Sequence, residues 1–369
     1  MKIEDYPWFC PEPFTNTMTA VGGLTKPCCV IDTKSWSGQS LDDFRKEFLG
    51  QPGELIEKCC VKCIHQERIG AKSQRQVSLE NFSDGNKFGH KKKQLEENLD
   101  NPPLLTMEWK AQDNLCNLKC NMCKPILSST LAKENIALGK PLHPKMSDAR
   151  YKGKNVFPDL SNIVELKLVG GETLAIAENY EIMEMCPPDV TLKITTNGTV
   201  TPKFDGKTIF NYIPKFKEVE INVSIEFWGE RNNYLRFPSK WERIMKNVQK
   251  FKSFDNCVVS YHCTLNALNV GYMLEILDNA DCPAVLGNLV WGKDEIYSIK
   301  SVPLSIREQY ISKYYNDYRD ETDKFISYLE DTEYDEVQMW KMIQDIKDRD
   351  KYRGTCLVDI FPEWKPYYV

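Results

Sequence analysis

The sequence predicts an α/β protein: an open, partial (β/α)6 barrel with a small cysteine-rich module before it and a helical extension after it. Three observations lead to this fold class. Segments of strand character alternate with helical segments from residue 104 onward, which is typical of a parallel sheet with right-handed crossovers. One side of each predicted strand is polar. Nine of the fourteen cysteines lie in the first third of the chain.

The N-terminal region, residues 1–80, contains cysteine pairs, Pro, Gly and one clear helical stretch at 41–49. Such a segment buries little core by itself, so we expect a module that a metal group holds together. Residues 81–103 are polar and charged, which suits a surface linker that ends at Pro102–Pro103.

The barrel is expected to cover residues 104–300. Strands are predicted at 104–110, 163–169, 190–196, 219–226, 257–265 and 284–291. Helices are predicted between them, near 126–138, 173–185, 208–216, 239–253 and 270–279. Residues 301–369 should form the helical extension, because charged faces and aromatic stripes recur there at helical spacing.

The polar side of the strands is unusual, because strands buried on both faces of a parallel sheet should be almost wholly apolar. Since side chains alternate with period two, the polar residues of each strand share one face. We expect this face to line a polar, substrate-binding lumen, with a half-exposed sheet as the alternative. The polar residues are Glu108, Lys110, Glu165, Lys167, Lys193, Thr195, Asn222 and Ser224, continued by His262 and Asn288.

The overall charge and hydropathy exclude some classes of function. A net charge of -5 provides no basic footprint, so no large nucleic-acid interface is expected. No run of 18 apolar residues is present, and the first residues are polar, so neither a membrane span nor a signal peptide is indicated. We therefore expect a cytoplasmic protein with no membrane partner, whose cysteines bind metal or do redox chemistry.

A loop after the first predicted strand reads CNLKCNMC and places Cys116, Cys120 and Cys123 in a C-x3-C-x2-C spacing. Three thiolates so close in sequence can hold three irons of a [4Fe–4S] cluster and leave the fourth iron open to a small ligand. A zinc site, or no metal at all, remains open on this spacing alone.

Three later segments accompany this loop. The second strand ends in VGGE at 169–172, the third ends in TTNGT at 195–199, and residues 223–248 read VSIEFWGERNNYLRFPSKWERIMKNV. Together with the cysteine loop, they resemble the radical S-adenosylmethionine (SAM) superfamily. The last segment is similar to the corresponding region of members with a twitch or SPASM-type auxiliary domain. The resemblance extends from residue 1 to about residue 300.

The resemblance implies reductive cleavage of SAM on the first cluster, giving a 5′-deoxyadenosyl radical that abstracts hydrogen from a substrate. The residue types fit this task, because glycines let the backbone approach a ligand closely and the planar guanidinium of an arginine can bind a carboxylate through two hydrogen bonds. Glu226 departs from the family, which more often has Asp there. By resemblance, the SAM contacts are Met122 at the adenine, Gly170, Gly171 and Glu172 at the amino group, and Ser224 and Arg236 at the ribose and carboxylate.

The N-terminal module resembles the auxiliary-cluster module that precedes the barrel in a subset of twitch-type members. Its segments FCPEPFTNTMTAVGGLTKPCCV and KCCVKC supply four thiolates, enough to close a second [4Fe–4S] cluster. The expected ligands are Cys10, Cys60, Cys63 and either Cys28 or Cys29. We favour Cys28, because the family ligand follows the G-x-x-x-P turn directly. Zinc is the alternative, since four thiolates also suit it.

The sequence thus predicts a two-cluster, SAM-dependent oxidoreductase or modifying enzyme. Its implied partners are an external electron donor such as flavodoxin or ferredoxin, and a small-molecule, nucleotide-like or peptide substrate. A non-catalytic iron–sulfur or zinc scaffold is the competing interpretation, although a scaffold has no use for an open iron. Residues that could act on the substrate are Lys110, Lys167, Lys193 and His262, with Cys263 either a hydrogen-atom donor or a buried strand cysteine.

Overall fold

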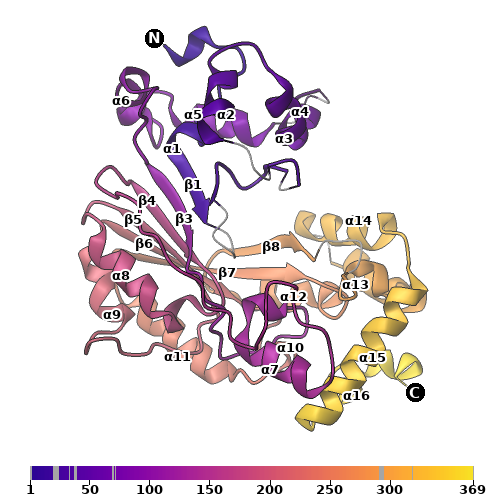
Figure 1. The fold of residues 1–369 in the computed structure, drawn as a ribbon. Helices are drawn as coiled ribbons and strands as arrows, with labels where there is room; N and C mark the ends of the chain where they lie inside the picture. Colours follow the sequence, from indigo (N-terminus) through magenta and orange to yellow (C-terminus); the bar gives the residue numbers. More distant parts are fainter. Residues whose placement is uncertain are drawn as a thin grey trace.

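The computed structural model describes residues 2–19, 25–32, 34–36, 40–68, 70, 72–290, 295–317 and 319–368. These residues form one eight-stranded sheet with helices packed against it (Figure 1). The strand order is β2-β1-β3-β4-β5-β6-β7-β8, parallel throughout except for the antiparallel pair β1–β2. The strands are β1 (Asn16–Thr19), β2 (Thr25–Lys26), β3 (Thr106–Lys110), β4 (Glu165–Val169), β5 (Thr191–Thr196), β6 (Glu218–Ser224), β7 (Cys257–Leu265) and β8 (Ala284–Leu289).

The six predicted strands are confirmed as β3 to β8, and each pairs with the next one along the chain. Sequential parallel pairing is expected when each crossover is a single short helical connection. In the described part of the chain no pairing joins β2 to β8, so the sheet is open. The curvature of a partial barrel stays a prediction. The last strand ends at Leu289, and Trp291 at the end of its predicted range lies outside the described residues.

The helices that follow the strands pack on the apolar face of the sheet. Residues such as Leu166, Leu192 and Ile221 are fully buried there, together with side chains of the helices. The predicted helix at 208–216 is a short helix followed by a 3-10 turn at Ile213–Lys215. These helices are α7 (Ser129–Ala137), α8 (Ala177–Met185), α9 (Ile209–Tyr212), α10 (Arg231–Leu235), α11 (Trp241–Lys252) and α12 (Met273–Asn279).

The N-terminal module has its own hydrophobic core and more helix than the single stretch predicted. It is joined to the main sheet by β1, which pairs in parallel with β3 and which the sequence did not indicate. Its helices are α1 (Glu12–Thr15), α2 (Leu41–Phe48), α3 (Glu54–Cys59), α4 (Val61–Arg68), α5 (Gln74–Asn81) and α6 (Lys92–Glu97).

Residues 81–103 are packed, in contrast to the surface linker that their composition suggested. Phe82, Phe88, Leu95 and Leu99 are buried in the N-terminal core. These four apolar residues are separated by many charged ones, so the average composition of the segment is polar although its apolar residues are buried.

The C-terminal extension is helical as predicted and lies beyond β7 and β8 (yellow in Figure 1). Its longest helix begins at an Asp335 cap, where the side chain accepts a hydrogen bond from Gln338 N, and ends at Gly354 with φ +69°. No described helix is long and apolar enough to cross a lipid bilayer. The helices are α13 (Leu304–Tyr315), α14 (Asp323–Asp331), α15 (Glu336–Arg353) and α16 (Leu357–Ile360).

Candidate functional site

A cavity of about 380 Å³ lies at the carboxyl ends of the central strands. In parallel α/β sheets this edge gathers the loops that follow successive strands, which is why ligands bind there. Among the wall residues of the cavity, Asn197 belongs to the TTNGT segment that the sequence analysis had noted without assigning it a contact, and Thr264 had not been singled out. The wall residues that the sequence analysis had singled out as cluster or SAM ligands are Cys116, Cys120, Met122, Cys123, Gly170, Gly171, Ser224 and Arg236.

The three-cysteine loop is held against the segment that carries Arg236. Lys119 N donates to Phe237 O at 2.8 Å, and Asn121 N donates to Leu235 O at 3.0 Å. The amides on either side of Cys120 are thus bonded to the carbonyls on either side of Arg236. Two chain segments more than 100 residues apart in sequence therefore share one fixed geometry at the cavity wall.

The thiols of this loop are sheltered from water. Cys116 and Cys120 are 8% and 7% exposed, and Cys123 is half-buried. Burial raises the pKa of all three thiols, that of Cys123 to about 12. A metal cluster must therefore displace protons when it binds here. Leu118 N lies 3.4 Å from Cys116 Sγ and donates a hydrogen bond that suits a thiolate ligand.

The VGGE motif makes room for the backbone of the cysteine loop. A Cβ placed on Gly171 would lie 2.4 Å from Leu115 O and 2.9 Å from Leu127 O, which are backbone atoms with no freedom to move away. Glu172 N donates to the same Leu115 O at 2.7 Å. The sequence suggested that Gly171 lets a ligand approach the backbone, whereas in the structure Gly171 is packed closely against the backbone of the cysteine loop.

Glu172, which the resemblance assigns to the SAM amino group, follows the cavity-lining Gly171 and is itself not part of the cavity wall. Its contact with SAM stays a prediction. Its carboxylate is fully buried and accepts hydrogen bonds from Leu174 N at 3.0 Å, Thr196 Oγ1 at 2.6 Å and Asn197 N at 2.8 Å. Burial raises its pKa against these bonds. Glu172 therefore ties the loop after β4 to the loop after β5.

The loop after β5 is bonded to the cysteine loop in turn. Asn197 Nδ2 donates to Asn117 Oδ1 at 3.0 Å, and Asn117 Nδ2 donates to Thr199 Oγ1 at 2.8 Å. The TTNGT segment thus supports the residue that follows Cys116. The segment therefore contributes to the site in two ways: it fixes the cysteine loop by hydrogen bonds, and its Thr195 and Thr196 line the cavity.

Arg236 is largely buried, with its side chain 12% exposed, and one of its N–H groups is free to bind a ligand. Its Nη1 donates to Glu226 Oε1 at 2.8 Å, while its buried Nε has no hydrogen-bond partner among the described residues. Burial raises the pKa of Glu226 to about 7, although Arg236 opposes this. Because buried guanidinium N–H groups are costly to leave unpaired, the free Nε suits a ligand carboxylate.

The polar face of the sheet carries a ladder of ion pairs. Lys167 pairs with Glu108 at 2.8 Å, and Lys193 pairs with Glu220 at 3.0 Å and Glu165 at 3.2 Å. The period-two alternation predicted for β3 to β6 is therefore present. Lys167 and Lys193 belong to a charge network, and burial lowers the pKa of His262.

Two other residues proposed to act on the substrate differ in position. Lys110, at the end of β3, forms no ion pair in the described part of the chain, and burial lowers its pKa. Cys263 is fully buried on the apolar face, 3.5 Å from Glu226 Oε2 and 3.8 Å from Met273 Sδ. Its position is that of a buried strand cysteine and not of a residue open to the lumen.

The N-terminal module brings four cysteines to one small cavity of about 20 Å³. Burial raises the pKa of Cys60, and the neighbouring thiols of Cys28 and Cys63 raise it further. The lining includes Cys28 and leaves out Cys29, which is exposed. The Gly23 of the turn before Cys28 lies outside the described residues. The four cysteines are Cys10, Cys28, Cys60 and Cys63.

A single zinc ion requires its ligands within about 2.3 Å of one point. In the parts of the chain that the structure describes, no three His, Cys, Asp or Glu side chains are grouped so as to hold one ion. In a [4Fe–4S] cluster each thiolate binds a different iron, so the donors surround a volume. Two cysteine-lined cavities, one with three thiols and one with four, fit that donor arrangement.

Known proteins offer limited comparison. No protein-family model and no curated protein match the chain. Among solved structures, Streptococcus suis SuiB bound to S-adenosylmethionine matches at 14% identity and TM-score 0.33, over 60% of this chain and 48% of that one. The protein anSMEcpe with bound AdoMet matches at 16% identity and TM-score 0.38, over 60% of this chain and 62% of that one. These matches span less than two thirds of either neighbour, and at such TM-scores the function has to be argued from the residues themselves.

Proposed function

We propose that this chain is a radical SAM enzyme. The observation that carries the proposal is the convergence of the cysteine loop at 116–123, the two glycines of the VGGE motif, Ser224 and Arg236 on one cavity. These residues lie at or after the ends of three different strands, β3, β4 and β6, and each is of the type that the SAM-binding role requires. A structural metal site would not need an unpaired guanidinium N–H beside its thiols.

The chain's own residues would divide the binding of SAM among them. Arg236 Nε would donate to the carboxylate, Ser224 would contact the ribose, and the half-buried Met122 would pack near the adenine. The buried thiols of the cysteine loop would hold a [4Fe–4S] cluster with one open iron. Together the bound groups would supply a 5′-deoxyadenosyl radical, which abstracts hydrogen from the substrate. The enclosing cavity would keep water from the reactive species.

The N-terminal module would hold an auxiliary [4Fe–4S] cluster on Cys10, Cys28, Cys60 and Cys63, as in the twitch or SPASM-type subgroup. Its position supports this role, because β1 connects the module directly to β3, the strand that leads into the cysteine loop. The auxiliary cluster would relay an electron from the substrate or help to bind it.

The substrate would bind against the polar face of the sheet, where Lys110, which has no ion-pair partner among the described residues, lies beside the cysteine loop. A polar metabolite, a nucleotide-like molecule or a peptide fits such a surface. An external low-potential donor, flavodoxin or ferredoxin, would reduce the cluster. The reaction would be an oxidation or another modification at an unactivated C–H bond.

The decisive test is anaerobic incubation of the reconstituted protein with dithionite and SAM, followed by assay of 5′-deoxyadenosine and methionine. Wild-type protein should form both products and contain roughly eight irons per chain. Replacing the three cysteines of the 116–123 loop by Ala should abolish product formation while about four irons remain. Cys186→Ala, a half-buried cysteine outside both cavities, is the matched control and should behave as wild type. Absence of SAM binding and cleavage with both clusters intact would leave the scaffold interpretation instead.

A further inference from the structure

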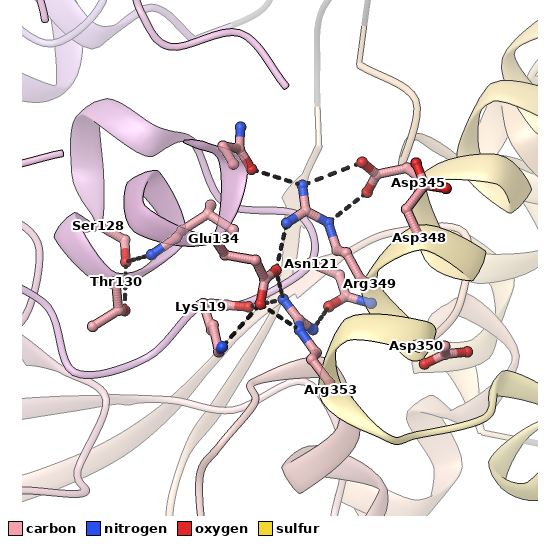
Figure 2. A network of polar contacts seen from close by, with 12 residues as sticks. Lys119, Asn121, Ser128, Thr130, Glu134, Asp345, Asp348, Arg349, Asp350 and Arg353 are labelled. Carbon is pink, nitrogen blue, oxygen red and sulfur yellow. Dashed lines mark hydrogen bonds and ion pairs between the residues drawn. The ribbon is translucent and has the colours of Figure 1, made fainter. Parts of the chain in front are cut away.

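A buried ion network connects the C-terminal helix α15 with the helix that follows the cysteine loop, α7 (Figure 2). At its centre is Glu134, whose side chain is 0% exposed. Its carboxylate pairs with Lys119 at 3.0 Å, with Arg349 Nη1 at 2.7 Å and with Arg353 Nη2 at 2.6 Å. Arg349 also pairs with Asp345 at 2.7 Å, so the buried charges of α7 and α15 form one continuous network.

Arg353 also reaches the cysteine loop itself. Its Nη2 donates to Lys119 O at 2.6 Å, and its Nη1 donates to Asn121 Oδ1. These two residues are the immediate neighbours of Cys120 on either side. The guanidinium is 2% exposed, so water does not compete for these bonds. Arg353, the last residue of α15, is therefore hydrogen-bonded to both neighbours of Cys120 in the three-cysteine loop.

The same guanidinium contacts the segment that carries Arg236. It lies over the Phe237 ring, 5.2 Å from its centroid. Phe237 O in turn accepts the hydrogen bond from Lys119 N. One side chain thus holds the loop that presents the thiols and rests on the segment that presents the carboxylate-binding group.

We propose that Arg353 is a positioning residue of the cofactor site, and that α15 is part of this site through it. The inference deepens the proposed function, since the loop that Arg353 holds is the proposed cluster loop. Planar and bidentate, the guanidinium donates to Glu134 through Nε and Nη2 while Nη1 and Nη2 hold the loop. A lysine ammonium has no fork with which to do both.

Amide hydrogen exchange in the full-length chain tests the grip without any cluster or SAM. In Arg353→Lys the amides of Lys119 and Asn121 should exchange roughly tenfold faster or more, the factor that corresponds to the loss of one charge-assisted hydrogen bond. Arg349→Lys is the matched control. It lies on the same helix and pairs with the same carboxylate, but in the described part of the chain its hydrogen bonds go to Glu134, Asn135 and Asp345 and none goes to the loop.

Unchanged exchange in folded Arg353→Lys, or equal acceleration in Arg349→Lys, would overturn the proposal. Should Arg353→Lys not fold, Asn121→Ala removes one acceptor of the guanidinium and keeps every buried charge in place. It should accelerate exchange at residue 121, and failure to do so also counts against the grip.

The reduction potential of the reconstituted loop cluster provides a second, independent measurement. Removing a buried positive charge beside thiolate ligands disfavours the reduced, more negative cluster. Arg353→Gln should therefore lower the potential, and a tenfold less favourable reduction corresponds to about 59 mV for one electron. A potential equal to that of wild type would exclude a role for this charge. If no cluster can be assembled, the proposed function fails, while hydrogen exchange still decides the positioning role.

Discussion

Replacing Glu134 by Gln should destabilise the protein strongly, because among the described residues it is the only carboxylate paired with Lys119 or with Arg353. Arg349 keeps a second partner, Asp345, at 2.7 Å. Lys119 is 19% exposed and can recover some hydration, whereas Arg353 at 2% exposure cannot. The cost is therefore that of one broken buried ion pair, about 3–5 kcal/mol. At about 2 °C per kcal/mol for a chain of this size, the melting temperature should fall by about 6–10 °C.

Thermal melting followed by circular dichroism would measure this loss. Glu333→Gln is the matched control, since Glu333 is exposed and forms no ion pair in the described part of the chain, and its effect should stay within about 0.5 kcal/mol. A fall of only 1–2 °C in Glu134→Gln would refute the assignment of a buried, charge-bearing Glu134, as would equal effects in both variants.

The pH dependence of the same pair provides a further check on Glu134. Burial raises its pKa, but hydrogen bonds and charges from Arg353, Lys119 and Arg349 outweigh burial and hold the pKa below 4.5. A depressed pKa in the folded state contributes stability that is present above the unfolded value and is lost as pH falls through the folded value. The advantage of wild type over Glu134→Gln should therefore be constant near neutrality and shrink below about pH 4.5.

Two other predictions concern the cofactor loops. Gly171→Ala should lower the stability of the loop at 116–123 and reduce iron content, because its Cβ would meet backbone carbonyls at 2.4 and 2.9 Å; wild-type melting and iron content in this variant would contradict the close contact. Cys28→Ala should reduce the iron content by about four per chain, whereas Cys29→Ala should leave it near eight, as iron and sulfide analysis of the two variants would show. The reverse result would exchange the roles of the two cysteines.

Much of the fold could be predicted from the sequence, because its signals are local. The alternation of polar and apolar residues in a strand such as β4 (Glu165–Val169) is visible within a window of a few residues. Helix caps are equally local signals. The order of strands β3 to β8 then follows the chain, because consecutive strands of one sheet are usually neighbours in space. The spacing of the cysteine loop is local in the same way.

Other features depend on contacts between distant parts of the chain. Phe82 and Leu95 lie in a segment predicted to be a linker, but in the folded chain they are buried in the N-terminal core. The motif assigns Glu172 to a ligand, and in the folded chain its carboxylate also accepts hydrogen bonds from Leu174 N of its own loop and from Thr196 and Asn197 at the end of β5. A motif records which residue is present and not which competing donor is nearest, and only packing decides that.

The sequence by itself determined the alternation of strands and helices, the two groups of cysteines and the residue types available at the carboxyl edge of the sheet. Only the tertiary structure decided that these residue types meet in one cavity, that Arg236 Nε has no partner among the described residues, and that Arg353 holds the loop around Cys120. The physical reason is range. Periodicity and capping act within a few residues, whereas a buried hydrogen bond between residues 119 and 353 exists only once the chain has folded and excluded water from both.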